Sequence, residues 1–367
     1  MSATLLTGAA GFIGSHLAER LVADGCSVRG VDAFTDTYAP AQKRDNVALV
    51  SADPRLELVT ADLARDDLSG LLDGVDAVVH LAGEPGVTAS WGTAFATYVE
   101  RNVVATQRLL EAATAAGVRR FVYASSSSVY GPEIGPLTES AVPRPLSPYG
   151  ASKLAGEVLV GAYAQQRGLS TVSLRYFSVY GPRQRPDMAA HRFIEALLDG
   201  RPVPVHGDGR QARDFTYVAD VVAATAAALT APVPTGTVLN VARGEPVEVR
   251  ELIAVLAEEL GVAPRVERRP ERAGDTPRTE GRADAARAGL GWEPLTDLRT
   301  GLRQQIEWHM HRRLATPSSA LADALRSSPV PTGLRVPVHE PPGGFAAEVV
   351  GAGSDAFREA VRWEAVR

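Results

Sequence analysis

Apolar runs and amphipathic stretches alternate along the first half of the chain. Six runs have the length and composition of buried strands, at residues 3–9, 27–33, 56–63, 77–83, 119–126 and 170–177. Three stretches between them repeat apolar residues at helical spacing, at 12–25, 93–117 and 149–167. Strands that alternate with helices predict an α/β fold, in which helices cover both faces of a parallel sheet.

The alternation loosens after about residue 180. Helices are predicted at 190–200 and 249–261, and a turn, short strand and helix within 203–229. A strand is predicted at 238–242 and a loop rich in arginine, proline and glycine at 264–282. We interpret this half as a smaller α/β domain that is partly interleaved with the first.

These patterns suggest a domain division. Residues 1–176 form the first predicted domain, which we expect also to receive segment 213–242. Residues 177–212 and 243–313 form the second. The remaining residues, 314–367, are rich in proline, serine and glycine with little periodicity, and the sequence assigns this C-terminal extension no role.

Composition and charge narrow the class of protein. The chain has 367 residues, of which 45% are hydrophobic and 22% charged, as in ordinary globular proteins. Its net charge is −5 and its basic residues are scattered, so we expect no nucleic-acid partner. No apolar run approaches the ~18–20 residues that span a membrane, so we expect a cytoplasmic protein. The single cysteine, Cys26, cannot form an internal disulfide, and no Cys/His cluster has metal-ligand spacing, so we expect no metal site.

The first predicted strand and helix are joined by the segment TGAAGFIGSH, residues 7–16. It places Gly8, Gly11 and Gly14 in the spacing G-x-x-G-x-x-G, which lets backbone N–H groups approach a pyrophosphate at the helix N-terminus. Asp32 ends the next strand, where its carboxylate can accept hydrogen bonds from a ribose 2′-OH and would repel a 2′-phosphate. The sequence therefore predicts a Rossmann-type site that prefers NAD to NADP. Asp62, which follows the third predicted strand, either faces the adenine or is an ordinary polar residue.

Tyr149 and Lys153 form the pattern Y-x-x-x-K on a predicted helix. Side chains four residues apart share a helix face, and a nearby ammonium lowers the pKa of a phenol from about 10. Tyr149 can then act as a general base near neutral pH. Lys153 is one of only two lysines in an arginine-rich chain, and its compact ammonium can also hydrogen-bond a ribose.

The chain resembles an extended short-chain dehydrogenase/reductase, of the nucleotide-sugar epimerase and dehydratase branch. Six segments carry the resemblance in order: TGAAGFIGSHL, HLAG, SSSSVYG, SPYGASK, LRYFSVYGPR and RDFTYVAD. They cover about residues 1–311 and are specific in combination. The resemblance implies a Rossmann domain that keeps NAD tightly bound and a smaller domain that binds a UDP- or dTDP-sugar. It also implies a homodimer built through the helices at 93–117 and 149–167.

Site residues follow from the same resemblance. Ser126 lies four residues before Tyr130 and matches a third catalytic residue, which shares the hydrogen bond to the reacting sugar oxygen. Arg213 and Arg272 match positions that bind the UDP diphosphate, and Asp275 matches one that holds the nucleotide ribose. Cofactor contacts are expected from Gly8, Gly11, Phe12, Ile13, Gly14, Asp32, Lys43, Asp62, Leu63, Leu81, Ala82, Gly83, Ser125, Tyr149, Lys153 and Tyr176.

The residues after Ser126 discriminate between reactions. Members of the branch that dehydrate a sugar carry an Asp-Glu pair there, whereas this chain has Ser127 and Ser128. Neither hydroxyl can act unaided as the acid or base that elimination of water requires, so dehydration is disfavoured. Reversible oxidation of the sugar at C4 remains. Hydride that leaves C4 and returns to the other face of a 4-keto sugar gives 4-epimerisation without net redox change.

The substrate clue is the segment RYFSVYGPRQRPDMA, residues 175–189, which resembles the stretch found in UDP-glucuronate 4-epimerases. The segment TDTYAPAQKRDNV, residues 35–47, does so too. The resemblance therefore favours UDP-glucuronate, whose carboxylate an arginine can bind through paired hydrogen bonds. Arg185 is the candidate, with Ser127, Ser128 and Ser178 as further donors. Trp91 departs from the commoner family pattern, which has arginine near Thr88.

Three alternatives stay open. The chain could be another sugar-nucleotide enzyme of this branch, such as a UDP-glucose 4-epimerase, and the products formed from a panel of UDP-sugars would reveal it. A reductase would consume NADH stoichiometrically. A non-catalytic NAD-binding scaffold is a different class of protein, and it would have no need of Ser126, Tyr149 and Lys153 together.

Overall fold

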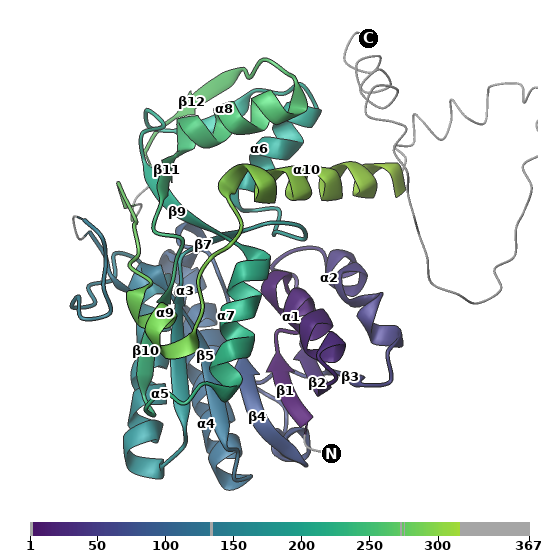
Figure 1. Cartoon of the computed structure of the whole chain (residues 1–367), viewed down its shortest axis with the longest axis vertical. Coiled ribbons are helices and arrows are strands. Elements are labelled where there is room, and N and C mark those ends of the chain that lie inside the picture. The colour runs from purple at the N-terminus through teal and green to yellow at the C-terminus, as the bar shows by residue number, and fades with distance from the viewer. Residues whose placement is uncertain (1–2, 133–134, 272–273, 275, 316–367) are drawn as a thin grey trace, which may run out of the picture.

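The computed structural model describes residues 3–132, 135–271, 274 and 276–315 (Figure 1). The strands are β1 (Ala3–Thr7), β2 (Ser27–Asp32), β3 (Leu56–Thr60), β4 (Val75–His80), β5 (Arg120–Ser126), β6 (Thr171–Tyr176), β7 (Ser178–Tyr180), β8 (Val203–His206), β9 (Ala212–Tyr217), β10 (Thr237–Val241), β11 (Pro246–Glu248) and β12 (Val266–Arg269). The helices are α1 (Phe12–Ala23), α2 (Pro40–Val47), α3 (Phe95–Tyr98), α4 (Ala105–Ala115), α5 (Pro148–Arg167), α6 (Ala189–Leu198), α7 (Val218–Thr230), α8 (Val249–Leu260), α9 (Asp284–Leu290) and α10 (Leu298–Ala315).

A seven-stranded parallel sheet forms the larger part of the molecule, with strand order β10-β6-β5-β4-β1-β2-β3. From β1 the chain builds outward in one direction through β2 and β3, and in the other through β4, β5, β6 and β10. The order therefore reverses beside β1, and a ligand site is expected at the carboxyl ends of β1 and β4. This architecture confirms the predicted Rossmann-type fold.

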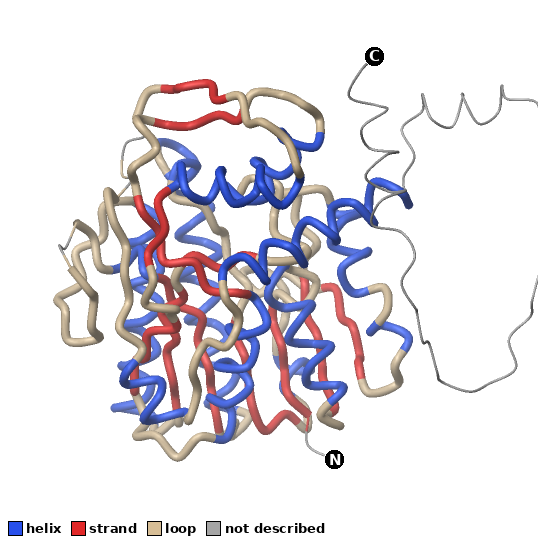
Figure 2. Tube along the Cα trace, turned by 45° about the horizontal axis from the view of Figure 1, so that its top comes forward, coloured by secondary structure: helices blue, strands red, loops and turns tan. Residues whose placement is uncertain are grey.

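The helices cover both faces of this sheet because neighbouring side chains of a strand point to opposite faces. Leu5 and Leu6 of β1 are both fully buried. Leu6 belongs to a core cluster that includes Leu17 of α1 and Val221 of α7, whereas Leu5 belongs to a second cluster that includes Leu109 of α4. Figure 2 shows the resulting layers, with helices on either side of the large sheet.

Two smaller sheets, β11-β9-β7 and β12-β8, lie above the large sheet in Figure 1, together with α6 and α8. Segment 213–242, which we expected to join the first domain, divides between the two regions. Helix α7 packs beside α1 and β10 pairs with β6, but β9 pairs with β7 and β11 instead. The domain boundaries themselves remain predictions.

Some elements differ from those that the sequence predicted. Strand β12 lies within a predicted loop, and its four residues are all exposed, so no apolar pattern marked it. Strand β7 follows directly after the strand predicted at 170–177, in a stretch for which the sequence predicted no strand. The long helix expected at 93–117 consists of α3, a π-helical turn at Val99–Val104, and α4. Of the predicted C-terminal extension, 314–315 end α10 and 316–367 lie outside the described residues.

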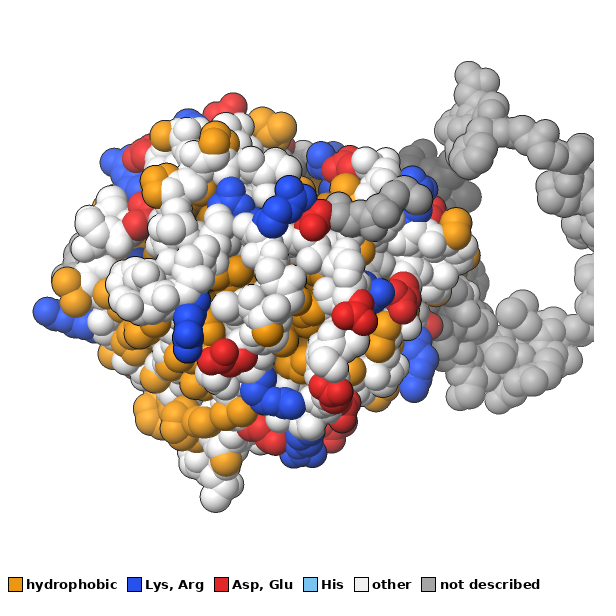
Figure 3. Space-filling view, turned by 90° about the horizontal axis from the view of Figure 1, so that it is seen from below, with side chains coloured by type: hydrophobic (Ala, Val, Ile, Leu, Met, Phe, Trp, Pro, Cys, Tyr) orange, Lys and Arg blue, Asp and Glu red, His pale blue; other side chains and the backbone are white. Residues whose placement is uncertain are grey.

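The described surface carries charges of both signs. Acidic and basic side chains are interspersed on the face seen in Figure 3. Among the described residues, no helix combines the length and hydropathy needed to cross a bilayer.

Helix α10 docks on α6 through a polar cluster that the sequence did not reveal, because its members lie 114 residues apart. Nδ1 of His309 lies 2.5 Å from a carboxylate oxygen of Glu195, and Arg313 donates to the other oxygen at 2.5 Å. His191 of α6 completes the cluster, in which one potential metal-ligand atom from each of His191, Glu195 and His309 lies within 4.8 Å of the others. Because Arg313 already binds Glu195, we interpret the cluster as an ion-pair network that holds α10.

Lowering the pH should destabilise the fold through two buried histidines. Burial lowers the pKa of His80 to about 3 and that of His191 to about 4, whereas an unfolded histidine has a pKa of about 6.5. The unfolded chain therefore binds more protons below pH 6.5. The free energy of unfolding should fall by about 1.4 kcal/mol per pH unit for each histidine as the pH drops from 6.5 toward 4. Urea unfolding at pH 7, 6 and 5 measures this fall.

The variant His191→Gln provides the control, because it removes one of the histidines whose pKa burial lowers. It should reduce the fall in the free energy of unfolding by about 1.4 kcal/mol per pH unit. A stability that stays constant between pH 7 and pH 5 in the unmodified protein would show that these histidines do not control it.

Candidate active site

A cavity at the carboxyl ends of β1 and β4 is lined by all sixteen residues that we expected to contact the cofactor. They reach it from the glycine-rich turn and the start of α1, from the ends of β2, β4, β5 and β6, from the loop after β3, and from helices α2 and α5. Arg185, predicted to bind substrate, lines the same cavity. Asp62 lines it too, while its carboxylate accepts the backbone N–H of Ala64 at 2.9 Å.

The glycine-rich turn leaves no room for side chains. A Cβ on Gly14 would lie 2.0 Å from the carbonyl oxygen of Gly8. A Cβ on Gly8, which has φ +71°, would lie 2.8 Å from the backbone nitrogen of Ala82. The backbone itself therefore forms this wall of the cavity, as a site that approaches a pyrophosphate closely requires.

Asp32 provides the acceptor expected for a ribose. Its carboxylate accepts the backbone N–H groups of Ala10 at 3.1 Å and Phe34 at 2.8 Å, which leaves further lone pairs for hydroxyl groups. Nζ of Lys43 lies 3.8 Å from Asp32 and donates to Oγ1 of Thr35 at 3.0 Å. Together with the bare glycine turn, this donor and acceptor set fits a dinucleotide.

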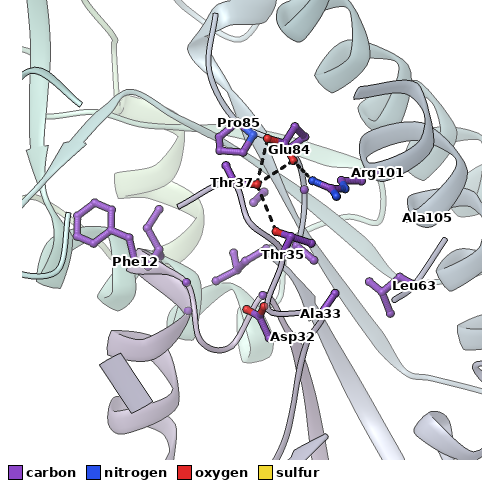
Figure 4. Close-up of a pocket in the computed structure, with 18 of the residues that line it drawn as sticks. Phe12, Asp32, Ala33, Thr35, Thr37, Leu63, Glu84, Pro85, Arg101 and Ala105 are labelled. Carbon is purple, nitrogen blue, oxygen red and sulfur yellow. Dashed lines mark hydrogen bonds and ion pairs between the residues drawn. The ribbon is translucent and has the colours of Figure 1, made fainter. Parts of the chain in front are cut away.

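A second group of polar residues on the cavity wall escaped the sequence analysis (Figure 4). Oγ1 of Thr37 donates to both carboxylate oxygens of Glu84 at 3.1 Å, and Arg101 pairs with Glu84 at 2.5 Å. These contacts join the loop after β2, the loop after β4 and the π-helical turn across the cavity. The signal available in the sequence was weak, because Glu84 merely follows the HLAG segment.

Asn102 links the loop after β4 to helix α5. Its amide oxygen accepts the N–H of Glu84 at 2.6 Å, and its amide nitrogen donates to Oγ of Ser152 at 2.9 Å. Asn102 is buried in the π-helical turn, a feature often found at functional sites. The position of α5 is thus fixed relative to the loop after β4.

The predicted catalytic residues meet where β5 ends and α5 begins. Ser147 caps α5 by accepting the N–H of Gly150 at 3.1 Å, which places Tyr149 in the first helical turn. Ser126 is the last residue of β5, and its side chain lies near enough to the Tyr149 phenol to favour the phenolate. Lys153 lies one turn further along α5 and lines the cavity with Tyr149.

The pKa of Tyr149 differs from our expectation. We expected the Lys153 ammonium to lower it, but burial raises this pKa above 10, opposed by the nearby Ser126 side chain and the positive charge of Arg185. Burial also lowers the pKa of Lys153 to about 8, against the opposing effect of Glu157. Nζ of Lys153 lies 4.9 Å from the centre of the Tyr123 ring. The groups in this structure that favour the Tyr149 phenolate are therefore Ser126 and Arg185.

The remaining predicted substrate residues lie around the smaller sheets and the turn after β5. Ser127 and Ser128 form that turn, Ser178 starts β7, and Arg213 lies in β9. Their contacts with a sugar nucleotide stay predictions. Arg272 and Asp275 lie outside the described residues.

Comparison with known proteins places this site in a family. A profile described as the NAD dependent epimerase/dehydratase family matches residues 4–242. The chain is 41% identical over 305 residues to the Bacillus subtilis (strain 168) protein named uncharacterized UDP-glucose epimerase YtcB, covering 83% of this chain and 96% of the relative.

Two solved proteins have closely similar structures. UDP-glucuronic acid 4-epimerase from Bacillus cereus, in complex with UDP-glucuronic acid and NAD, has a TM-score of 0.83 at 38% identity, covering 84% of this chain and 99% of that chain. MoeE5 has been solved with NAD and either UDP-glucose or UDP-glucuronic acid. Both MoeE5 structures have a TM-score of 0.77 at 43% identity, covering 85% of this chain and at least 99% of theirs.

These matches confirm the predicted resemblance, the predicted class of enzyme and the predicted NAD cofactor. The family profile covers well over half of the chain, and the relatives are matched over nearly their whole length. The chain therefore belongs to the NAD-dependent epimerase/dehydratase family.

Proposed function

We propose that the protein is a UDP-sugar 4-epimerase that converts UDP-glucuronate to UDP-galacturonate. The observation that carries this proposal is the grouping of Ser126, Tyr149 and Arg185. Ser126 and the positive charge of Arg185 both favour the phenolate of Tyr149, and Tyr149 and Arg185 line the same cavity. This grouping supports a proton acceptor and a carboxylate ligand that act on one sugar.

Each side chain has a separate role in the proposed reaction. NAD, when bound, supplies the acceptor that takes hydride from C4 of the sugar and gives it back to the opposite face. Tyr149 takes the proton of the C4 hydroxyl as hydride leaves, and returns it when the 4-keto sugar is reduced. Ser126 holds the reacting oxygen beside the phenol. Lys153, with a pKa of about 8, is mostly protonated at neutral pH and can donate to a ribose.

Arg185 would have two roles, because it would bind the sugar carboxylate and would suppress the loss of CO2 from the 4-keto intermediate. Its guanidinium can bind the C5 carboxylate of the sugar through paired hydrogen bonds. A 4-keto uronate is a β-keto acid, which readily loses CO2 when the breaking bond aligns with the ketone π system. Holding the carboxylate away from that alignment would suppress the loss and keep the sugar for reduction.

A UDP-glucose 4-epimerase is the second candidate. It is favoured by the similarity to a protein named as a UDP-glucose epimerase, and by the similarity to MoeE5, which was solved with both sugar nucleotides. Incubating the purified protein with a panel of UDP-sugars, without added cofactor, separates the candidates by NMR of the products. UDP-galacturonate from UDP-glucuronate supports the proposal. UDP-galactose as the sole product would favour the second candidate, and a UDP-pentose would indicate decarboxylation.

Replacing Arg185 by leucine should damage the use of UDP-glucuronate far more than that of UDP-glucose. Losing a charged hydrogen-bonding partner costs about 1.5–3 kcal/mol, which corresponds to about a 10- to 150-fold lower kcat/KM on the acidic sugar. Steady-state kinetics of Arg185→Leu on both sugars measures the difference. An equal loss on both would refute the assignment of Arg185 as the carboxylate ligand.

We also propose a cytoplasmic homodimer. In support of the dimer, Val104 and Val158 are exposed hydrophobic residues on the two segments expected to form its interface, with exposures of 41% and 64%. Light scattering after size exclusion measures the mass of the particle in solution.

A further inference from the structure

Arg185, the proposed ligand of the substrate carboxylate, already binds a carboxylate of the protein. Its Nε and one Nη donate to the two oxygens of Asp187 at 3.0 and 2.9 Å. Paired N–H···O bonds of this kind are the geometry in which arginine recognises carboxylates. Asp187 therefore occupies one of the two edges of the guanidinium that could each donate a pair of hydrogen bonds to the carboxylate of a uronate.

Hydrogen bonds of the two preceding residues fix the backbone position from which the Arg185 side chain extends. Arg183 adopts φ +63° and donates to Glu19 of α1 at 2.6 Å. The side-chain oxygen of Gln184 accepts the N–H of His191 at 3.0 Å and the side-chain amide of Gln305 at 2.8 Å. These contacts tie the two preceding residues to α1, α6 and α10.

The two partners of the pair differ in their exposure. The side chain of Arg185 is only 18% exposed, whereas that of Asp187 is 56% exposed. Asp187 can therefore turn toward solvent once its hydrogen bonds to Arg185 are broken, while Arg185 stays in the cavity wall.

We propose that Asp187 sets the substrate preference of the site, because its charge competes with an acidic sugar for Arg185. This inference rests on the proposed function, in which Arg185 is the carboxylate ligand. An incoming carboxylate either displaces Asp187 or binds the remaining N–H groups beside it. The negative charge of Asp187 opposes binding in both cases. A neutral sugar meets no such opposition, since Asp187 keeps Arg185 neutralised.

The test compares binding of UDP-glucuronate and UDP-glucose to the full-length holoenzyme by calorimetry. A Tyr149→Phe background prevents turnover during the titration. In that background, Asp187→Asn should raise the ratio of the Kd for UDP-glucose to the Kd for UDP-glucuronate about tenfold. Asp187→Ser should raise it at least as far, because it also removes the amide oxygen that could still accept from Arg185.

Asp53→Asn is the matched control. Asp53 pairs with Arg55 through two hydrogen bonds at the same two-residue spacing, in an exposed turn outside the cavity. This substitution should leave the ratio unchanged. A ratio that is unchanged or lower in both Asp187 variants overturns the inference, because a purely structural role would affect both ligands alike. The proposed function fails separately, if the unmodified enzyme makes no UDP-galacturonate.

Discussion

Replacing Tyr149 by phenylalanine should lower kcat by about 10³-fold while the protein stays folded and retains its NAD. General acid–base groups contribute about 10²–10⁴-fold to rate, and Tyr149 carries both proton transfers in the proposed cycle. Phenylalanine keeps the ring that packs edge-on against Tyr98, with centroids 6.2 Å apart, and removes only the hydroxyl. Product formation by NMR gives the rate, and the absorbance of heat-released cofactor gives the NAD content.

Tyr163→Phe is the control, because it removes a hydroxyl from the same helix α5. That hydroxyl hydrogen-bonds Glu111, and Tyr163 does not line the cavity. This variant should keep its activity within about twofold. If Tyr149→Phe also kept its activity, the reaction would have to use another proton acceptor.

Replacing Gly14 by alanine should remove the cofactor and destabilise the fold. The new Cβ would lie 2.0 Å from the carbonyl oxygen of Gly8 and 2.8 Å from its carbonyl carbon, so backbone atoms must move. Overpacking costs about 1–3 kcal/mol, and here the backbone that shifts is the turn expected to bind the pyrophosphate. We expect a free energy of unfolding lower by about 3 kcal/mol and purified protein with little NAD. Urea unfolding and cofactor release measure the two effects.

Gly161→Ala tests the same substitution in a helix with open space. Apart from its two chain neighbours and the backbone of its own helix, no atom of the described residues lies within 4 Å of the point that a Cβ on Gly161 of α5 would occupy. Alanine there should leave NAD bound and stabilise the protein by up to about 1 kcal/mol, because it has the higher helix propensity. A Gly14→Ala protein that retained full NAD and normal stability would mean that the turn tolerates side chains, contrary to its packing.

The grouping of the expected cofactor residues around one cavity could be predicted from the sequence because local segments build that cavity. The glycine turn, Asp32 and the Tyr149–Lys153 pair each lie at the end of a strand or the start of a helix. A parallel sheet brings such ends to one edge. All sixteen expected residues therefore lie together at the cavity.

Contacts between distant segments could not be predicted in this way. Thr37 and Glu84 lie in loops without a periodic pattern, and the helical pattern that contains Arg101 does not show which loop this side chain meets. The pKa of Tyr149 was predicted wrongly for a related reason. Sequence spacing reveals which charges are near in the chain, but the dominant effect here is burial, which depends on the whole fold.

The Asp187 contact shows a third limit. It is only two residues from Arg185, and the sequence analysis treated Arg185 as free to bind substrate. Which of two acidic groups an arginine binds depends on exposure and side-chain direction, and neither is visible in the sequence.

The central claim is that hydride leaves C4 and returns to C4 of the same sugar. UDP-glucuronate carrying deuterium at C4 tests it directly, incubated with the purified protein in ordinary water without added NAD. The account predicts UDP-galacturonate that retains the deuterium fully at C4, detected by NMR and mass spectrometry. Product that has exchanged this deuterium for solvent hydrogen, or a UDP-pentose in place of UDP-galacturonate, would contradict it.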